Sequence, residues 1–260
     1  MKSVVYFFTG TGNSLEVANA LTEALPNCTL LSMGKDTHDS EVVYDTIGFV
    51  YPTYAYNAPL RVKQFLQESS FERSKRAYFF AVTTCGGKDV SALPVVAKLL
   101  KHQGITLDFA EAITMVRNAV VYYKMDEKNA EIQQTASRKI PELVHRIIAK
   151  EQQHAAKLNV PLNTITALYQ KTTFPNKDRH YNVSDSCTDC KICVEICPVS
   201  NIETVGKRPS FNHHCEQCLA CLQWCPSRAI NFKNKTQERG RYQNPNVSLR
   251  DLAKGNACSS

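Results

Sequence analysis

The fold of this chain is decided near its N-terminus, by a stretch that reads Val4-Val5-Tyr6-Phe7-Phe8-Thr9-Gly10-Thr11-Gly12-Asn13-Ser14. Its first five residues are a continuous apolar run, which is typical of a central parallel strand that is buried on both faces. After the stretch, apolar residues recur at helical spacing until Pro26 ends the pattern. The sequence therefore predicts a strand, a tight loop and a helix in direct succession.

The loop between this strand and this helix is suited to holding a phosphate. Glycines let the backbone approach a ligand closely, and the free N–H groups of a helix N-terminus attract anions. The candidate ligands are Thr9, Gly10, Thr11, Gly12, Asn13 and Ser14. Neither the lysine of a nucleoside-triphosphate loop nor the glycine spacing of a dinucleotide loop is present. An ordinary tight turn that caps the helix is the alternative interpretation.

Strands and helices alternate through the first 154 residues. Further strands are expected at residues 29–33, 47–51, 77–82 and within 105–116, and helices at 15–25, 59–67, 91–103 and 126–153. Asp126 is the candidate N-cap of the last helix, and Pro141 predicts either a kink or a division into two helices. This alternation predicts an α/β fold with a doubly wound, parallel, five-stranded sheet, whose ligand lies at the carboxyl ends of the strands.

Two more loops leave those strand ends, and with the first they resemble the FMN-binding loops of flavodoxins. Residues 52–59 correspond to the loop on one face of the flavin ring, and residues 83–87 to the loop along its other side. The resemblance implies FMN and the following contacts: Pro52, Thr53, Tyr54, Tyr56, Asn57, Thr83, Thr84, Cys85, Gly86 and Gly87. A tyrosine at 54 or 56 would stack on the ring, or alternatively cap the sheet.

Two features depart from the flavodoxin pattern. The second loop has no glycine between Pro52 and Pro59, so the peptide flip that stabilises a one-electron-reduced flavin is not expected. The third loop offers Cys85 in place of an aromatic residue. Cys85 is interpreted as a small loop residue rather than a reactive thiol.

Eight of the eleven cysteines form an internal repeat in the second half of the chain. The two runs are Cys187-x-x-Cys190-x-x-Cys193-x-x-x-Cys197-Pro198 and, 28 residues later, Cys215-x-x-Cys218-x-x-Cys221-x-x-x-Cys225-Pro226. In this spacing three thiolates hold one iron–sulfur cube, and the fourth cysteine ligates the other cube. We therefore expect one [4Fe-4S] cluster on Cys187, Cys190, Cys193 and Cys225, and a second on Cys215, Cys218, Cys221 and Cys197.

Apolar residues between the cysteines are expected to jacket the clusters: Ile192, Ile196, Leu219, Leu222 and Trp224. A zinc site and a disulfide framework are the alternatives. Zinc sites use separated cysteine pairs, and disulfides need an oxidising compartment. Residues 181–232 resemble the bacterial-type two-cluster ferredoxins, and this resemblance implies a small α+β domain that transfers single electrons.

Charge and hydrophobicity exclude several other classes of protein. The formal charge of +7 invites a nucleic-acid partner. Two clusters of about −2 each and a flavin phosphate would bring the protein near neutrality, so no nucleic-acid binding is expected. No apolar run approaches the length of about 18 residues that a membrane span needs, and the N-terminus does not read as a signal peptide. The sequence thus predicts a cytoplasmic protein without stable membrane insertion.

The expected organisation is a flavodoxin-like domain at 1–154, a polar linker at 155–180, a ferredoxin-like domain at 181–235 and a basic tail at 236–260. The arrangement resembles the fused flavodoxin–ferredoxin electron-transfer proteins. It implies a low-potential carrier that moves electrons between FMN, two clusters and redox partner proteins. The alternative is an FMN-dependent reductase of a small acceptor such as a quinone. The absence of an acid–base constellation in the sequence favours the carrier, whereas the oligomeric state stays open.

Overall fold

The computed structural model describes residues 1–36, 38–125 and 127–256, and its central element is one parallel sheet. The five strands lie in the order β2-β1-β3-β4-β5, and all neighbours are parallel. The bounds are β1 Ser3–Phe7, β2 Cys28–Ser32, β3 Thr46–Pro52, β4 Tyr78–Cys85 and β5 Phe109–Thr114. This strand order defines the flavodoxin-like fold, so the predicted α/β class and five-stranded parallel sheet are confirmed.

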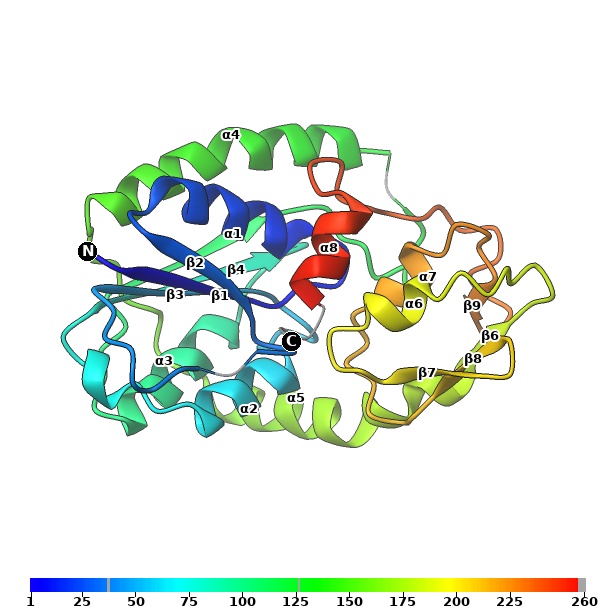
Figure 1. Ribbon diagram of the computed structural model, residues 1–260, viewed down its shortest axis with the longest axis horizontal. Helices are drawn as coiled ribbons and strands as arrows, with labels where there is room; N and C mark the ends of the chain where they lie inside the picture. The colour runs from blue at the N-terminus through cyan, green and yellow to red at the C-terminus, as the bar shows by residue number, and fades with distance from the viewer. Residues whose placement is uncertain (37, 126, 257–260) are drawn as a thin grey trace.

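Helices cover both faces of the sheet (Figure 1). The helices are α1 Asn13–Ala24 and α4 Asn129–Ile148 on one face, and α2 Leu60–Glu68 and α3 Ala92–His102 on the other, with a short 3₁₀ turn at Glu72–Ser74. Alternate residues of β1 face opposite cores: Val5 and Phe7 pack toward α1, and Val4 and Tyr6 toward α2. Burial on both faces explains why these strands are continuously apolar.

Helix α4 runs through Pro141 as one element. Of the two alternatives predicted at that proline, a kink or a division into two helices, the division does not occur. The candidate N-cap Asp126 lies outside the described residues, and the helix begins after Lys128.

The stretch predicted as a polar linker contains helix α5, Val160–Thr173, followed by a 3₁₀ turn at Pro175–His180. Asn159 caps α5 by accepting a hydrogen bond from the Leu162 amide, and Pro161 occupies the first turn, where its missing N–H costs nothing. The buried residues of α5 are Thr166 and Gln170, whereas Ile165 and Leu168 are exposed. The polar face of the helix is therefore its inner face.

Residues 181–232 form two antiparallel strand pairs and two one-turn helices, with bounds β6 Tyr181–Val183, α6 Ile192–Glu195, β7 Ile202–Val205, β8 Arg208–Phe211, α7 Ala220–Gln223 and β9 Ile230–Phe232. We call this part the cysteine half. It lies at one end of the sheet (Figure 1). Ile196, Ala220 and Trp224 join the same apolar core as α1 and α4, so the two parts share a core.

The C-terminal segment returns to the sheet and ends in α8, Leu249–Asn256 (Figure 1). Val247 and Leu252 belong to the core on the α1 face. No helix of the described residues is both long and apolar enough to cross a membrane.

Candidate functional site

The first loop lies at the carboxyl end of β1 and is closed in on all sides. All six of its candidate residues, 9–14, are buried. Gly12 precedes α1 with a φ of 102°, a left-handed conformation that favours glycine. Among the described residues, no acceptor binds the amides of Thr11, Asn13 or Ser14. Buried, unpaired N–H groups at a helix N-terminus suit a phosphate group.

Hydroxyl groups connect this loop to its neighbours. The Ser14 and Thr84 hydroxyls are 2.8 Å apart, and those of Thr53 and Thr83 are 2.9 Å apart. Asn118, which follows β5, donates its side-chain amide to the Thr11 hydroxyl. The structure thus brings the three predicted loops together at one edge of the sheet.

The second loop makes a tight reversal after β3. The backbone N–H groups of Tyr54 and Asn57 donate to each other's carbonyl groups at 2.9 and 3.0 Å. The two residues between them, Ala55 and Tyr56, both have positive φ, at 46° and 62°. Such a turn normally selects glycine or asparagine, so the backbone is strained where the flavodoxin pattern often has a glycine. Tyr54 packs edge-on against Phe8.

Tyr54 and Tyr56 occupy different environments. Tyr54 is half-buried, and burial with the nearby Cys218 and Glu216 raises its pKa well above its usual range. Tyr56 is 58% exposed. Of the two tyrosines, Tyr54 is therefore the one more shielded from solvent.

The third loop contributes a thiol and two glycines. Cys85 is buried and donates to the Gly87 carbonyl at 3.1 Å, and burial raises the pKa of its thiol. A Cβ on Gly86 would lie 2.5 Å from the Arg117 side chain, so Arg117 lies directly on this loop.

The C-terminal residues 240–247, which we call the strap, lie across the first loop. The Asn244 amide donates to the Thr11 carbonyl at 2.9 Å, and the Tyr242 hydroxyl to the Asn13 side chain at 2.7 Å. A Cβ on Gly12 would lie 2.8 Å from Asn244 Cβ. The strap therefore covers the candidate phosphate loop from outside.

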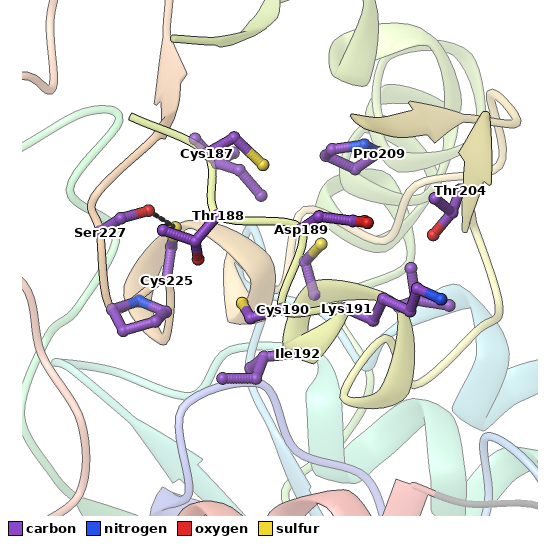
Figure 2. Close-up of a pocket in the computed structure, with 14 residues that line it drawn as sticks. Cys187, Thr188, Asp189, Cys190, Lys191, Ile192, Thr204, Pro209, Cys225 and Ser227 are labelled. Atoms are coloured by element: carbon purple, nitrogen blue, oxygen red, sulfur yellow. Dashed lines mark hydrogen bonds between the residues drawn. The ribbon is translucent and has the colours of Figure 1, made fainter. Parts of the chain in front are cut away.

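The eight repeat cysteines line two cavities. The first cavity encloses about 400 Å³, part of it open to solvent, and is lined by Cys187, Cys190, Cys193 and Cys225. Figure 2 shows the sulfur atoms of Cys187, Cys190 and Cys225 around this space. The second spans about 330 Å³, also partly open to solvent, and is lined by Cys197, Cys215, Cys218 and Cys221. Each cavity thus combines three cysteines of one run with the fourth of the other. Within the described ranges no group of three or more His, Cys, Asp or Glu side chains is arranged closely enough to hold a metal ion.

The sequence repeat is also a repeat of backbone conformation. Residues 28 positions apart share a left-handed φ: 54° and 55° at Asp189 and Gln217, and 59° and 62° at Lys191 and Leu219. These rare conformations wrap each cysteine run around its cavity. The apolar residues that were predicted to surround the clusters lie in two places. Ile192 and Leu219 line the cavities, whereas Ile196 and Trp224 pack into the core of the sheet.

Burial disfavours the thiolate form of the cysteines. Burial, reinforced by Cys190 and Cys225, raises the pKa of Cys193 to about 12, and burial raises the pKa of Cys218 well above its usual range. Backbone amides donate to two of the sulfurs, from Asn201 to Cys197 at 3.2 Å and from Gln217 to Cys215 at 3.3 Å. A metal that coordinates such sulfurs removes their protons and satisfies their charge.

The cysteine half and the sheet edge are in direct contact. A Cβ on Gly10 would lie 2.3 Å from the Cys218 carbonyl oxygen. Glu216 accepts hydrogen bonds from the amides of Leu60 at 3.1 Å and Arg61 at 2.5 Å, and so caps α2 from outside. Burial raises the pKa of Glu216 to about 7. The candidate flavin loops and the second cavity are therefore neighbours.

Several site residues have no sequence signal: Arg117, Asn118, Glu216, Tyr242 and Asn244. Each is a single polar residue in a loop, and only long-range folding brings it to the site.

No protein-family model matches the chain, and neither does any curated protein sequence. Among solved structures, a flavodoxin from the domain Archaea is 16% identical over 56% of this chain and 99% of its own, with a TM-score of 0.37. An azoreductase from Bacillus anthracis str. Sterne is 12% identical over 56% of this chain and 100% of its own, with a TM-score of 0.39. At these identities and TM-scores the likenesses carry no argument about function.

Proposed function

We propose that this chain is an electron carrier that binds FMN at the sheet edge and a [4Fe-4S] cluster in each cysteine-lined cavity. The observation that carries the proposal is that each cavity is lined by three cysteines of one run and the last cysteine of the other. Two-cluster sites of this spacing require that arrangement, because the fourth cysteine of each run ligates the other cluster. A single zinc ion would instead need four ligands about 2.3 Å from one point.

The flavin part of the proposal is supported by the first loop. The unpaired amides of Thr11, Asn13 and Ser14, with the hydroxyls of Thr9 and Ser14, would hold the phosphate. Tyr54 and the loop at residues 83–87 would flank the ring. When bound, FMN would supply a group that accepts one or two electrons.

Direct contact between the two parts of the molecule favours a carrier over a reductase. Cys218 lies against Gly10 of the first loop. A carrier needs a short internal path, which the contact between the second cavity and the first loop supplies.

A reductive titration of the anaerobically purified protein tests this function. About four electrons should enter each chain, about one per cluster and two per flavin. The reduced protein should then pass them rapidly to an oxidised redox protein, and only slowly to a quinone. Steady turnover of the quinone would contradict the carrier.

A further inference from the structure

Buried polar atoms without partners gather around the cysteine cavities. In the described part of the chain, Tyr181, Gln217, Trp224 and Arg241 each have a buried polar side-chain atom that makes no hydrogen bond. Arg241 has two such atoms, Nε and Nη1. An unpaired guanidinium group is the most costly of these, because burying charge without hydrogen bonds is strongly unfavourable.

The position of the Arg241 guanidinium is fixed by its remaining nitrogen. Nη2 donates to the Asn231 side-chain oxygen at 2.7 Å and to the Ile230 carbonyl at 3.3 Å. The next residue is also held, since the Tyr242 amide donates to the Gln223 side chain at 2.8 Å. The N–H groups of the two unpaired nitrogens therefore keep a constant direction.

Arg241 lies next to the first cavity. Ile230, whose carbonyl it binds, lines the first cavity together with Cys225. Cys221 lines the second. Burial and Arg228 lower the pKa of Arg241, and Cys225 and Cys221 oppose that shift, so its charge interacts with one cysteine of each set. An arginine stays protonated at physiological pH despite such burial.

We propose that Arg241 raises the reduction potentials of both clusters through its positive charge. The inference rests on the proposed function. Each cluster takes one electron from the reductant and its negative charge grows by one, while no protein bond is made or broken. A nearby cation stabilises the reduced form more than the oxidised form.

The two clusters should respond unequally. Arg241 donates to the carbonyl of Ile230, which lines the first cavity, whereas neither of its acceptors lines the second. The cluster of Cys187, Cys190, Cys193 and Cys225 should therefore depend more strongly on Arg241 than the second cluster.

The test compares R241M, which removes the charge, with R241K, which keeps it, in the anaerobically purified full chain. R250Q removes one charge from an exposed residue of α8 and serves as the control. Iron and sulfide contents are measured first, and the potentials then follow from a titration with dithionite monitored by electron paramagnetic resonance. In R241M the ratio of reduced to oxidised first cluster should fall at least tenfold at a fixed potential, a shift of about 59 mV for one electron. The ratio should fall less in R241K than in R241M. In R241M the potential of the second cluster should shift less than that of the first, and in R250Q neither potential should shift.

Unshifted potentials in an R241M protein that holds its iron would overturn the inference, even if its melting temperature fell. If R241M loses iron, R241Q takes its place with the same expected shift. Loss of iron in both would also overturn the inference, because Arg241 would then be needed for assembly rather than potential. A wild-type chain without iron would overturn the proposed function and the inference together.

Discussion

At the scale of single residues, Gly10 is where the sheet edge and the cysteine half meet. A Cβ at this position would lie 2.3 Å from a backbone oxygen of Cys218, which cannot swing aside. Gly87 belongs to a neighbouring loop, and a Cβ added there would have no other atom within 4 Å. The two glycines thus differ only in what surrounds them.

We expect G10A to lower the free energy of unfolding by about 1–3 kcal/mol, because overpacking forces the two parts of the molecule apart. G87A should change it by less than about 1 kcal/mol. Urea denaturation of both variants measures the difference. Equal stability of G10A and G87A would show that the contact is not tight.

Glu216 predicts a pH dependence. Its pKa rises from 4.5 in the unfolded chain to about 7 in the folded one, so folding favours its protonated form. The stability that protonation contributes is complete below pH 4.5 and is lost as the pH rises through 7. Lys63, whose pKa burial lowers to about 8, stays mostly charged in this window.

The E216Q variant keeps an acceptor for the amides of Leu60 and Arg61 but has no charge to lose. Between pH 5 and pH 8 the wild type should therefore lose stability relative to E216Q, by on the order of 2–3 kcal/mol. Thermal midpoints of both proteins across this range measure the effect. A difference that stays constant with pH would contradict the burial of a charged Glu216.

At the scale of elements, α5 shows where sequence prediction succeeds and where it ends. The strands and α1 to α3 were predictable, because their apolar residues face a core at regular spacing. Helix α5 was predicted as an aperiodic linker, because its buried residues are polar and its apolar residues point outward. Its inner side chains bind the second loop: Asn57 donates to Asn163 at 2.9 Å and to Thr166 at 3.0 Å.

Gln170 is the central residue of this inverted face. It is fully buried, donates to the carbonyls of Tyr54 and Ala58 at 2.8 and 3.1 Å, and accepts from Lys63 at 2.6 Å. Q170L should therefore lower the unfolding free energy by at least about 2 kcal/mol, since it leaves buried groups unpaired. L168Q, on the exposed face, should stay within about 0.5 kcal/mol. A larger loss in L168Q than in Q170L would mean that the helix faces the other way.

The candidate site was predictable to a similar extent. Its cysteines and its glycine- and hydroxyl-rich loop carry their chemistry in local spacing. The strap does not, since the sequence predicted only a basic tail at residues 236–260. Tyr242 and Asn244 reach Asn13 across more than 200 positions, and no local pattern encodes such a contact.

At the scale of the whole molecule, the shared core makes the two halves one cooperative structure. Trp224 is the single tryptophan and packs with the α1 side of the sheet. In anaerobic urea unfolding, its fluorescence should therefore change at the same midpoint as the far-ultraviolet ellipticity, which reports mainly the larger helices. Two separate midpoints would indicate independent domains joined by a tether.

The central claim is that this molecule joins one flavin to two iron–sulfur clusters. Anaerobic purification followed by iron, acid-labile sulfide, zinc and flavin analysis tests it most directly. The account predicts about eight irons, about eight sulfides and about one FMN per chain. Zinc in place of iron, or clusters without any FMN, would contradict it.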